Sequence, residues 1–440
     1  MSRAGRPANR NDPGLMSDTI FALSSGAPPA AIAIIRISGP DAHRVAGDLC
    51  RQPLPKTRTA GVRALRQPDG LLIDRALVML FAAPATATGE NMAELHCHGG
   101  RAVVAAVERA LEVLGCRRAE AGEFTRRAFC NGRMDLAEAE GLADLLAAET
   151  ELQRAAAISL TEGRFSTQVE EWRQHILRLS ALVEAALDFA DDDDAAHLPA
   201  SFRNEVADLA ADLAEWLSRP RSDRLKEGVQ VVIAGPPNSG KSTLFNALVE
   251  DEAAITSPEA GTTRDAIERH VAIEGVPFTF IDTAGLRDEG AGSIEAIGIG
   301  RARRYIDRAD LVLWLGPEGE GPPKALEVET RIDAPSGSGK RSPDHRVSGR
   351  TGEGVDQLKL AIAEKARNLL PRAGQVALNN RQALLLAQAH AALAQIVGEQ
   401  DDLVIAEHLR QTRVAFDAVL GRTATEDMLD ALFGRFCIGK

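Results

Sequence analysis

The stretch "GPPNSGKS", residues 235–242, constrains the fold of this chain more strongly than any other feature of its sequence. It fits the pattern G-x-x-x-x-G-K-[ST] and directly follows the apolar run "VQVVIA". Such a loop needs a buried strand before it and a helix after it, because backbone N–H groups and the helix N-terminus together surround phosphate groups. The stretch therefore predicts a P-loop inside an α/β domain, which we place at residues 227–367.

Each position of this loop has an expected role. Backbone groups of Asn238, Ser239, Gly240 and Thr243 are expected to surround the phosphates. Lys241 is expected to reach the outer phosphates, and Ser242 offers a hydroxyl to Mg²⁺.

Two later stretches indicate a GTPase. "AGTTRD" supplies Thr263 as a further Mg²⁺ ligand, and "FIDTAG" places Asp282 at the end of a strand. Thr283 and Ala284 follow it, and Gly285 can approach the γ-phosphate through its N–H.

The expected base-recognition element is less typical. GTPases usually read guanine with N-K-x-D, whereas "TRID" here has Thr330 and Arg331 before Asp333. Asp333 can still accept the guanine N1–H and amine protons, and "VSGRTGEG" with Ser348 follows where a second base-contacting element is expected. These residues favour guanine and leave its selection over adenine open.

The regions around the α/β domain differ from it. Residues 1–133 predict an α+β domain, with strands in "AAIAIIRISG", "RALVMLFAA" and "MAELHCHGG". Residues 134–226 and 368–440 predict helices, the first with Leu136, Ala139, Leu142 and Leu146 on one stripe. Neither helical part closes a core alone, so we expect one helical domain made of both segments, with the α/β domain inserted between them.

Composition limits the kinds of partner and the cellular compartment that suit this chain. The net charge of −12 is uneven, because residues 1–133 hold 18 Lys and Arg against 12 Asp and Glu. A globally acidic surface repels nucleic acid, so an RNA substrate would have to meet a local patch or a partner protein. Five cysteines without C-x-x-C spacing favour a reducing cytoplasm, and no apolar run predicts a membrane span or secretory signal. Residues before about Met16 are expected to be a loose leader.

Two groups of residues allow a metal-binding interpretation. The run Asp191–Asp194 can be a metal cluster, but a solvated loop between helices is the more common role for such a run. "HCH", with His96 and His98 on one strand face, lacks a third ligand motif and is more typical of packing or hydrogen bonding.

Over nearly its whole length the chain resembles the tRNA-modification GTPases of the MnmE (TrmE) family. The resemblance rests on "DTIFALSSG", "IIRISG", "TGENMAELHCHGG", "AGEFTRRAFCNGRMDLAEAE", "DTAGLRDEGAGSIEAIGI" and the terminal "FCIGK", together with the G motifs. It implies a multidomain fold of α+β and α/β type: a folate-binding N-terminal domain, a two-segment helical domain and an inserted Ras-like P-loop G domain.

The resemblance also implies an activity. Members are cytoplasmic homodimers that act with the flavoprotein MnmG, as a heterotetramer in which MnmG carries FAD. Together they add aminomethyl or carboxymethylaminomethyl groups to C5 of the wobble uridine of certain tRNAs. The one-carbon unit is expected from 5,10-methylenetetrahydrofolate, whose site also accepts a 5-formyl analogue. A regulatory or ribosome-associated GTPase is the alternative, since the G motifs alone are shared with such switches.

Site residues carry over by position. The resemblance assigns K⁺ ligation to Asn238 and to backbone groups of Ser257, Glu259 and Thr262, and orientation of the attacking water to Glu295. It assigns folate contacts to Arg36, Glu94, Arg133 and Lys440. Without it, Arg36 would be interpreted as part of a surface salt bridge.

The terminal "GRFCIGK" places a cysteine three residues from the end. Thr425 is expected to cap a helix in which Met428, Leu432 and Phe433 anchor this tail. Buried cysteines are usually inert, whereas the resemblance places Cys437 near the folate site as a catalytic candidate.

Overall fold

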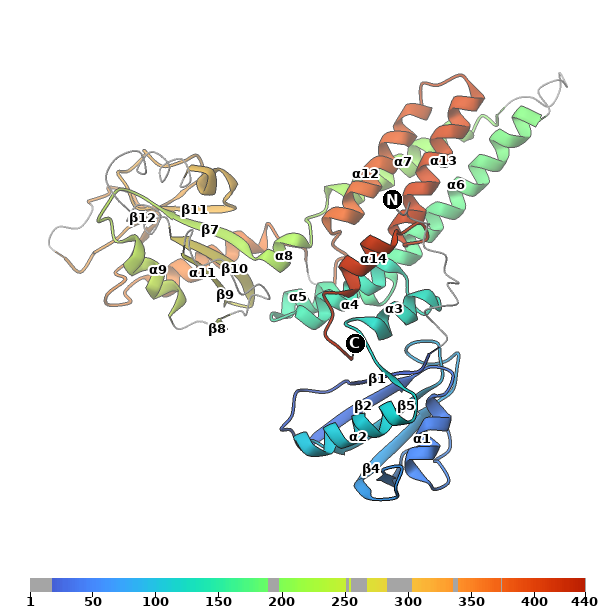
Figure 1. The fold of residues 1–440 in the computed structure, drawn as a ribbon. Coiled ribbons are helices and arrows are strands. Elements are labelled where there is room, and N and C mark those ends of the chain that lie inside the picture. The colour runs from blue at the N-terminus through green and yellow to red at the C-terminus, as the bar shows by residue number, and fades with distance from the viewer. Residues whose placement is uncertain are drawn as a thin grey trace, which may run out of the picture. The chain divides into compact units, whose positions relative to one another are not determined.

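The computed structural model describes residues 18–188, 198–250, 253–254, 267–282, 303–334, 339–372 and 374–439 (Figure 1). The chain divides into two compact units. The first unit comprises Met1–Ala143, Thr161–Asn204 and Ala391–Lys440, and the second comprises Asp144–Leu160 and Glu205–His390.

The N-terminal part of the first unit is built on a six-stranded sheet in the order β3-β4-β5-β2-β1-β6. Its strands are β1 (Ile20–Leu23), β2 (Ile32–Ser38), β3 (Gly61–Arg66), β4 (Leu72–Phe81), β5 (Met92–His98) and β6 (Arg117–Arg118). Helices α1 (Ala42–Cys50) and α2 (Arg101–Val113) share one buried core with the sheet. In β2, Ala33, Ile35 and Ile37 enter this core, so the alternating side chain of Arg36 lies on the opposite face.

A buried arginine ties helix α3 (Glu123–Cys130) to the strands. Arg127 has only 3% of its side chain exposed, and its guanidinium pairs with Asp18, Glu90 and Glu123 at 2.6–3.2 Å. Burial of a charge is costly unless it is paired, and three carboxylates meet this need here. The cluster fixes α3 beside β1.

Two distant chain segments form the helical part of the first unit, as Figure 1 shows for α6 and α13. Helix α6 (Arg164–Asp188) packs on α13 (Asp402–Val419) through the stacked rings of Trp172 and Phe416, whose centroids are 5.9 Å apart. The ion pair between Arg173 and Asp417, at 2.7 Å, adds to the contact. This packing confirms a helical domain made of two segments.

The remaining helices outside the α/β region differ from expectation in one respect. They are α4 (Leu136–Ala147), α5 (Glu151–Thr161), α7 (Phe202–Ser218), α12 (Asn380–Ile396) and α14 (Glu426–Phe433). The predicted stripe was wrong at its end, because Leu136 and Ala139 are buried whereas Leu146 is 46% exposed. Helix α4 stops at Ala147, so Leu146 lies in its last turn rather than inside a longer helix.

The second unit holds a seven-stranded sheet in the order β13-β12-β11-β7-β10-β9-β8. Its strands are β7 (Val229–Ala234), β8 (Ala253–Ala254), β9 (Ile267–Ile273), β10 (Val276–Asp282), β11 (Leu311–Trp314), β12 (Leu326–Glu329) and β13 (His345–Arg346). Strand β7 is parallel to both β10 and β11. Parallel central strands are buried on both faces, and every residue of β10 is buried here.

Helices α8 (Asp223–Glu227), α9 (Lys241–Val249) and α11 (Val355–Arg367) also belong to this unit, and residues 303–308 are helical as well. Together the two units confirm the predicted multidomain fold of α+β and α/β type, with a Ras-like P-loop domain in the second unit. Asp191–Asp194 lie outside the described residues. In the part of the chain that the structure describes, no helix is both long and apolar enough to cross a membrane.

Candidate functional site

The P-loop joins β7 to α9 at the carboxyl edge of the parallel sheet. Gly240 is the N-cap of α9 at φ 91°, and Asn238 has φ 60°, a conformation that asparagine tolerates better than most residues. A side chain at Gly235 would place its Cβ 3.0 Å from Ser239 Oγ and 3.1 Å from the Leu315 carbonyl carbon. Both glycines thus allow the loop to curl over the start of the helix.

Lys241 lies under this loop. It is buried, and its Nζ donates to the carbonyl oxygens of Pro236 at 2.8 Å and Gly235 at 3.2 Å. The ammonium group is therefore held inside the ring of backbone that the motif forms. Ser242 and Thr243, in the first turn of α9, are exposed.

Asp282 ends β10 beside the P-loop strand. The register pairs Asp282 with Ile233, two residues before the loop begins. The residue is 2% exposed, so its carboxylate is shielded from bulk solvent. The structure thus brings together the P-loop and the predicted Asp282.

The base-recognition element is assembled from two loops. Asp333 accepts hydrogen bonds from Ser348 Oγ at 2.6 Å and Arg350 Nε at 2.8 Å. The Ser348 hydroxyl, and after it the Arg350 guanidinium, lower the pKa of the Asp333 carboxyl below its usual value. The carboxylate therefore stays ionised, which is the form that only accepts hydrogen bonds, as the N–H groups of a base edge require.

A contact that sequence reasoning missed links this element to the P-loop. Thr330 Oγ1 donates to the Ser239 carbonyl oxygen at 2.6 Å, and Thr330 is buried. Thr330 stands where the usual motif has asparagine, so the substituted side chain still reaches the loop. In the sequence, Thr330 was notable only because it departs from the N-K-x-D motif. That departure did not predict the hydrogen bond to Ser239.

Several predicted site residues lie outside the described residues, and the structure does not place them. They are Ser257, Glu259, Thr262, Thr263, Thr283, Ala284, Gly285, Glu295 and Lys440.

The residues that are described fit a nucleotide phosphate group with Mg²⁺. Ser239 Oγ is buried and has no hydrogen-bond partner within the described ranges, so a phosphate oxygen can satisfy it. Gly235 and Gly240 leave the space that a Cβ would fill, and α9 directs its N-terminus to the same point. Ser242 would supply a hydroxyl ligand to the cation.

The predicted folate contacts on the N-terminal sheet form a pair. Arg36 and Glu94 are directly opposite in the β2–β5 register, and Arg36 Nη2 lies 3.0 Å from Glu94 Oε1. The Arg36 guanidinium also lies 5.9 Å from the ring centroid of Phe124. Both side chains stand on the sheet face away from the main core, and their role in folate binding stays a prediction.

Arg133 is exposed on the segment that follows α3. A Cβ at Gly89 would lie 3.2 Å from Arg133 Cγ, and the neighbouring Asn131 donates from Nδ2 to the Thr88 carbonyl oxygen at 2.7 Å. Arg133 therefore borders the loop that leads into β5, the strand of Glu94.

The C-terminal tail lies along the N-terminal sheet. Ile438 forms an antiparallel bridge with Ala121, and Ser24 Oγ donates to the Gly439 carbonyl oxygen at 2.9 Å. Cys437 is exposed, as is Ile438 after it, whereas Phe436 before it is buried. The structure thus holds Cys437 beside β1, the neighbour of the strand that carries Arg36.

The other four cysteines are less accessible. Burial raises the pKa of the Cys50 and Cys116 thiols to about 11, and that of Cys97 to about 12. Cys130 is half-buried. Cys437 is therefore the exposed thiol of the chain, a property that matches its predicted role.

The histidines of "HCH" contact carboxylates. His96 Nε2 lies 3.4 Å from Glu94 Oε2, and His98 Nδ1 lies 2.7 Å from Asp74 Oδ1. Among the described residues, no group of three or more His, Cys, Asp or Glu is arranged to hold a metal ion. These contacts correspond to the hydrogen-bonding alternative.

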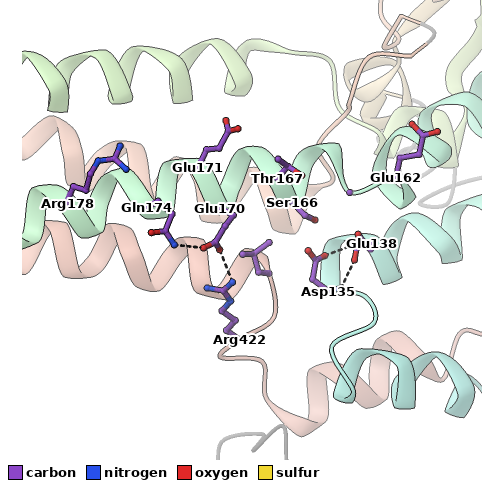
Figure 2. Close-up of a pocket in the computed structure, with 12 residues that line it drawn as sticks. Asp135, Glu138, Glu162, Ser166, Thr167, Glu170, Glu171, Gln174, Arg178 and Arg422 are labelled. Carbon is purple, nitrogen blue, oxygen red and sulfur yellow. Dashed lines mark hydrogen bonds and ion pairs between the residues drawn. The ribbon is translucent and has the colours of Figure 1, made fainter. Parts of the chain in front are cut away.

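A cavity of about 640 Å³ lies at the junction of α4, α6 and the end of α13 (Figure 2). Asp135 and Glu138 form a capping box in its wall: Asp135 N donates to Glu138 Oε2 at 2.8 Å, and Glu138 N donates to Asp135 Oδ1 at 2.9 Å. Burial raises the pKa of both carboxyls. Across the cavity, Arg422 pairs with Glu170 at 2.8 Å.

Comparison with known proteins bears on the identity of this assembly. The family model described as "MnmE helical domain" matches residues 136–437, and "GTP-binding protein TrmE N-terminus" matches residues 19–133. A protein of Erythrobacter litoralis named "tRNA modification GTPase MnmE" is 58% identical over 424 residues, which cover 96% of this chain and 100% of that protein. The protein of the same name from Novosphingobium aromaticivorans is 56% identical over 438 residues, which cover 97% of this chain and 100% of that protein.

The chain belongs to the MnmE family. This membership confirms the family that the sequence motifs predicted and, with it, the predicted class of GTPase. The P-loop, Asp282 and the Asp333–Ser348 pair all lie in the second unit.

Proposed function

We propose that this chain is a cytoplasmic GTPase that acts in tRNA modification. The observation that carries the proposal is the assembly, at one edge of the second unit's sheet, of the P-loop, the buried Asp282 and the ionised Asp333. These supply a phosphate cradle, a carboxylate near the cation and a base acceptor. Their occurrence in a chain 58% identical to a tRNA modification GTPase supports the tRNA role.

The chain's own groups have separate tasks in hydrolysis. Lys241 Nζ leaves its carbonyl partners for the outer phosphates, and the N–H groups of Ser239 to Thr243 hold the remaining oxygens. Ser242 and Thr263 supply oxygen ligands to Mg²⁺, which offsets the charge of the transferring group. Glu295 orients the water that attacks the γ-phosphate.

We infer that K⁺ supplies the charge that an arginine finger provides in other GTPases. Asn238 occupies a left-handed loop position in the phosphate cradle, which suits a side-chain carbonyl ligand. Backbone groups of Ser257, Glu259 and Thr262 complete the proposed set.

Potassium dependence tests this assignment. GTP hydrolysis should be at least several-fold faster in KCl than in NaCl at equal ionic strength, because Na⁺ is smaller and fits the same ligands poorly. Asn238→Ala should remove most of the difference. Glu295→Ala should lower kcat and leave nucleotide affinity intact, since it acts only in the transition state. Equal rates in the two salts would contradict the inference.

The first unit is assigned the one-carbon chemistry. Arg36, Glu94, Arg133 and Lys440 would bind a tetrahydrofolate derivative on the sheet face beside the tail, and Cys437 would act there as an exposed thiol. With a flavoprotein partner that carries FAD, a homodimer would form a heterotetramer. The product would be an aminomethyl or carboxymethylaminomethyl group at C5 of the wobble uridine.

Each predicted segment of the chain is proposed to have its own role. Residues 1–133 are proposed to bind folate and to form the dimer contact, and residues 227–367 to bind the nucleotide. Residues 134–226 and 368–440 would connect the two. A regulatory or ribosome-associated GTPase would leave wobble uridines intact on deletion, which separates it from this proposal.

A further inference from the structure

The positive charge of the N-terminal part is concentrated in one short segment. Residues 49–68 contain five basic side chains and no Asp or Glu. The five are Arg51, Lys56, Arg58, Arg63 and Arg66. They occupy the end of α1, the loop that follows it and strand β3, all within the first unit.

The arginines of this segment bond to backbone rather than to carboxylates. Arg63 Nε donates to the Pro53 carbonyl oxygen at 2.6 Å, and Arg66 Nη1 donates to that of Gly70 at 2.9 Å. Arg51 and Arg58 likewise donate to the carbonyl oxygens of Pro68 and Ala85. Neutral acceptors fix the geometry of these guanidinium groups without cancelling their charge.

Several other arginines of the N-terminal part, in contrast, pair with carboxylates. Arg117 pairs with Asp18 and Glu123, Arg118 pairs with Glu108 and Glu112, and Arg127 has its three carboxylates. Among the described residues, no carboxylate lies within 4 Å of the cationic groups of the five in residues 49–68. The segment therefore keeps an uncompensated positive charge.

The five side chains follow an edge of the sheet. Strand β3 is the terminal strand and pairs only with β4, and Arg58 precedes it on the same edge. The six extended residues of β3 cover about 20 Å, a span that a few consecutive phosphates of an RNA strand can match. A recess of about 310 Å³ at one end is lined by Arg51 and Arg66 together with Asp48, whose carboxylate pairs with Arg44.

We propose that this basic edge, residues 49–68, binds the phosphodiester backbone of tRNA. The inference rests on the proposed function, because it supplies the RNA contact that a tRNA-modifying enzyme needs. Residues 134–440 hold 33 Lys and Arg against 51 Asp and Glu, so the remaining chain repels a polyanion on average. Contacts of this kind position an RNA without reading its sequence.

A basic edge can have roles other than RNA binding, and each predicts a different result in the binding experiment. Cations on an edge strand also prevent two sheets from pairing, which needs no RNA. Pairing of the edge with a second copy would bring ten cations together, and this arrangement is disfavoured by repulsion. Binding to an anionic membrane is a separate alternative that the experiment distinguishes.

The test is binding of transcribed tRNA to the full chain over a range of KCl concentrations. Lys56→Glu/Arg58→Glu changes two exposed residues of the edge. The matched control is Lys324→Glu/Arg341→Glu, which makes the same charge change at two exposed residues of the second unit. We expect the first variant to bind tRNA at least about tenfold more weakly, with a slope of log K against log salt reduced by about 1 to 2. The control should stay within about twofold of the wild type.

Several results would overturn the proposal. If the two variants bind tRNA equally well, or if both lose affinity, the basic edge is not the tRNA contact. Absence of salt-sensitive tRNA binding by the wild-type chain would do the same. Loss of binding to phosphatidylserine vesicles, or new self-association, without a change in tRNA affinity would assign the edge another role. GTP turnover without tRNA should be equal in all three proteins, so a failure of the GTPase proposal is detected separately.

Discussion

At the scale of single residues, Thr330 connects the proposed base-recognition element to the P-loop. Thr330 replaces the usual asparagine, and its hydroxyl still donates to the Ser239 carbonyl oxygen of the P-loop. The hydrogen bond ties the base-contacting loop to the phosphate-contacting loop. We therefore regard Thr330 as a positioning residue for nucleotide binding.

The substitution Thr330→Val tests this role. Valine has nearly the same shape but leaves the Ser239 carbonyl without its donor, which costs about 0.5–1.5 kcal/mol. GTP affinity should fall by about two- to twelvefold in a titration with a fluorescent analogue. Thr330→Asn restores a donor and should stay near the wild-type affinity. Unchanged affinity of the valine variant would show that the hydrogen bond does not position the loop.

Asp135 illustrates a residue whose charge opposes folding. Burial raises the pKa of its carboxyl above 3.8, so the folded state holds a proton more tightly than the unfolded state. Stability therefore falls as pH rises from the unfolded pKa through the folded pKa, and the full cost is present above that window.

The substitution Asp135→Asn keeps the capping acceptor for Glu138 N and removes the ionisation. The variant should melt at a higher temperature than the wild type at pH 8, and the difference should shrink as pH falls towards 4. Thermal unfolding followed by circular dichroism at several pH values measures it. A constant difference, or a less stable variant at pH 8, would contradict the burial argument.

At the scale of elements, helix α14 determines where the cysteine tail lies. Arg126 of α3 pairs with Asp430 at 2.8 Å and with Glu426, and the rings of Phe129 and Phe433 lie 6.2 Å apart. Thr425 takes the predicted N-cap position, but its side chain makes no capping hydrogen bond. Tertiary contacts to α3, rather than the cap, hold the helix.

Substitutions at two glycines test the contact between α14 and the start of α3. Gly122 has φ 67°, and a Cβ there would lie 2.2 Å from the Phe433 carbonyl oxygen, whereas Gly115 has φ 90° and open space around it. Gly122→Ala should destabilise the first unit by more than about 2 kcal/mol, and Gly115→Ala only by the 1–2 kcal/mol of left-handed strain. Hydrogen exchange should accelerate in residues 426–439 only for Gly122→Ala. Equal exchange in both variants would show that α14 is not held at Gly122.

The sequence was sufficient to predict the elements with strong patterns. The alternation in "IAIIRIS" and the P-loop motif predicted β2, β7 and α9, because local periodicity and one glycine motif determine them. The exposure of Leu146 was not predicted, because the spacing that placed it on the stripe does not show that α4 ends at Ala147. The Thr330–Ser239 bond joins residues 91 apart in sequence, a separation that no local pattern encodes.

At the scale of the whole molecule, the proposed function assigns two chemistries to one chain. The first unit brings residues 18–143 together with the C-terminal tail, and the second unit carries the nucleotide-binding residues. The segments before and after the P-loop domain pack on each other as α6 and α13, so insertion of that domain leaves the helical core continuous. This arrangement lets a GTPase occupy the middle of a chain whose two ends share a proposed folate site.

The central claim, GTP-dependent modification of wobble uridine, is tested most directly by mass spectrometry of tRNA nucleosides from a deletion strain. We predict that C5-aminomethyl and carboxymethylaminomethyl uridines disappear, return with the wild-type gene, and do not return with Lys241→Ala or Cys437→Ser. An unchanged wobble-nucleoside profile in the deletion strain would contradict the account.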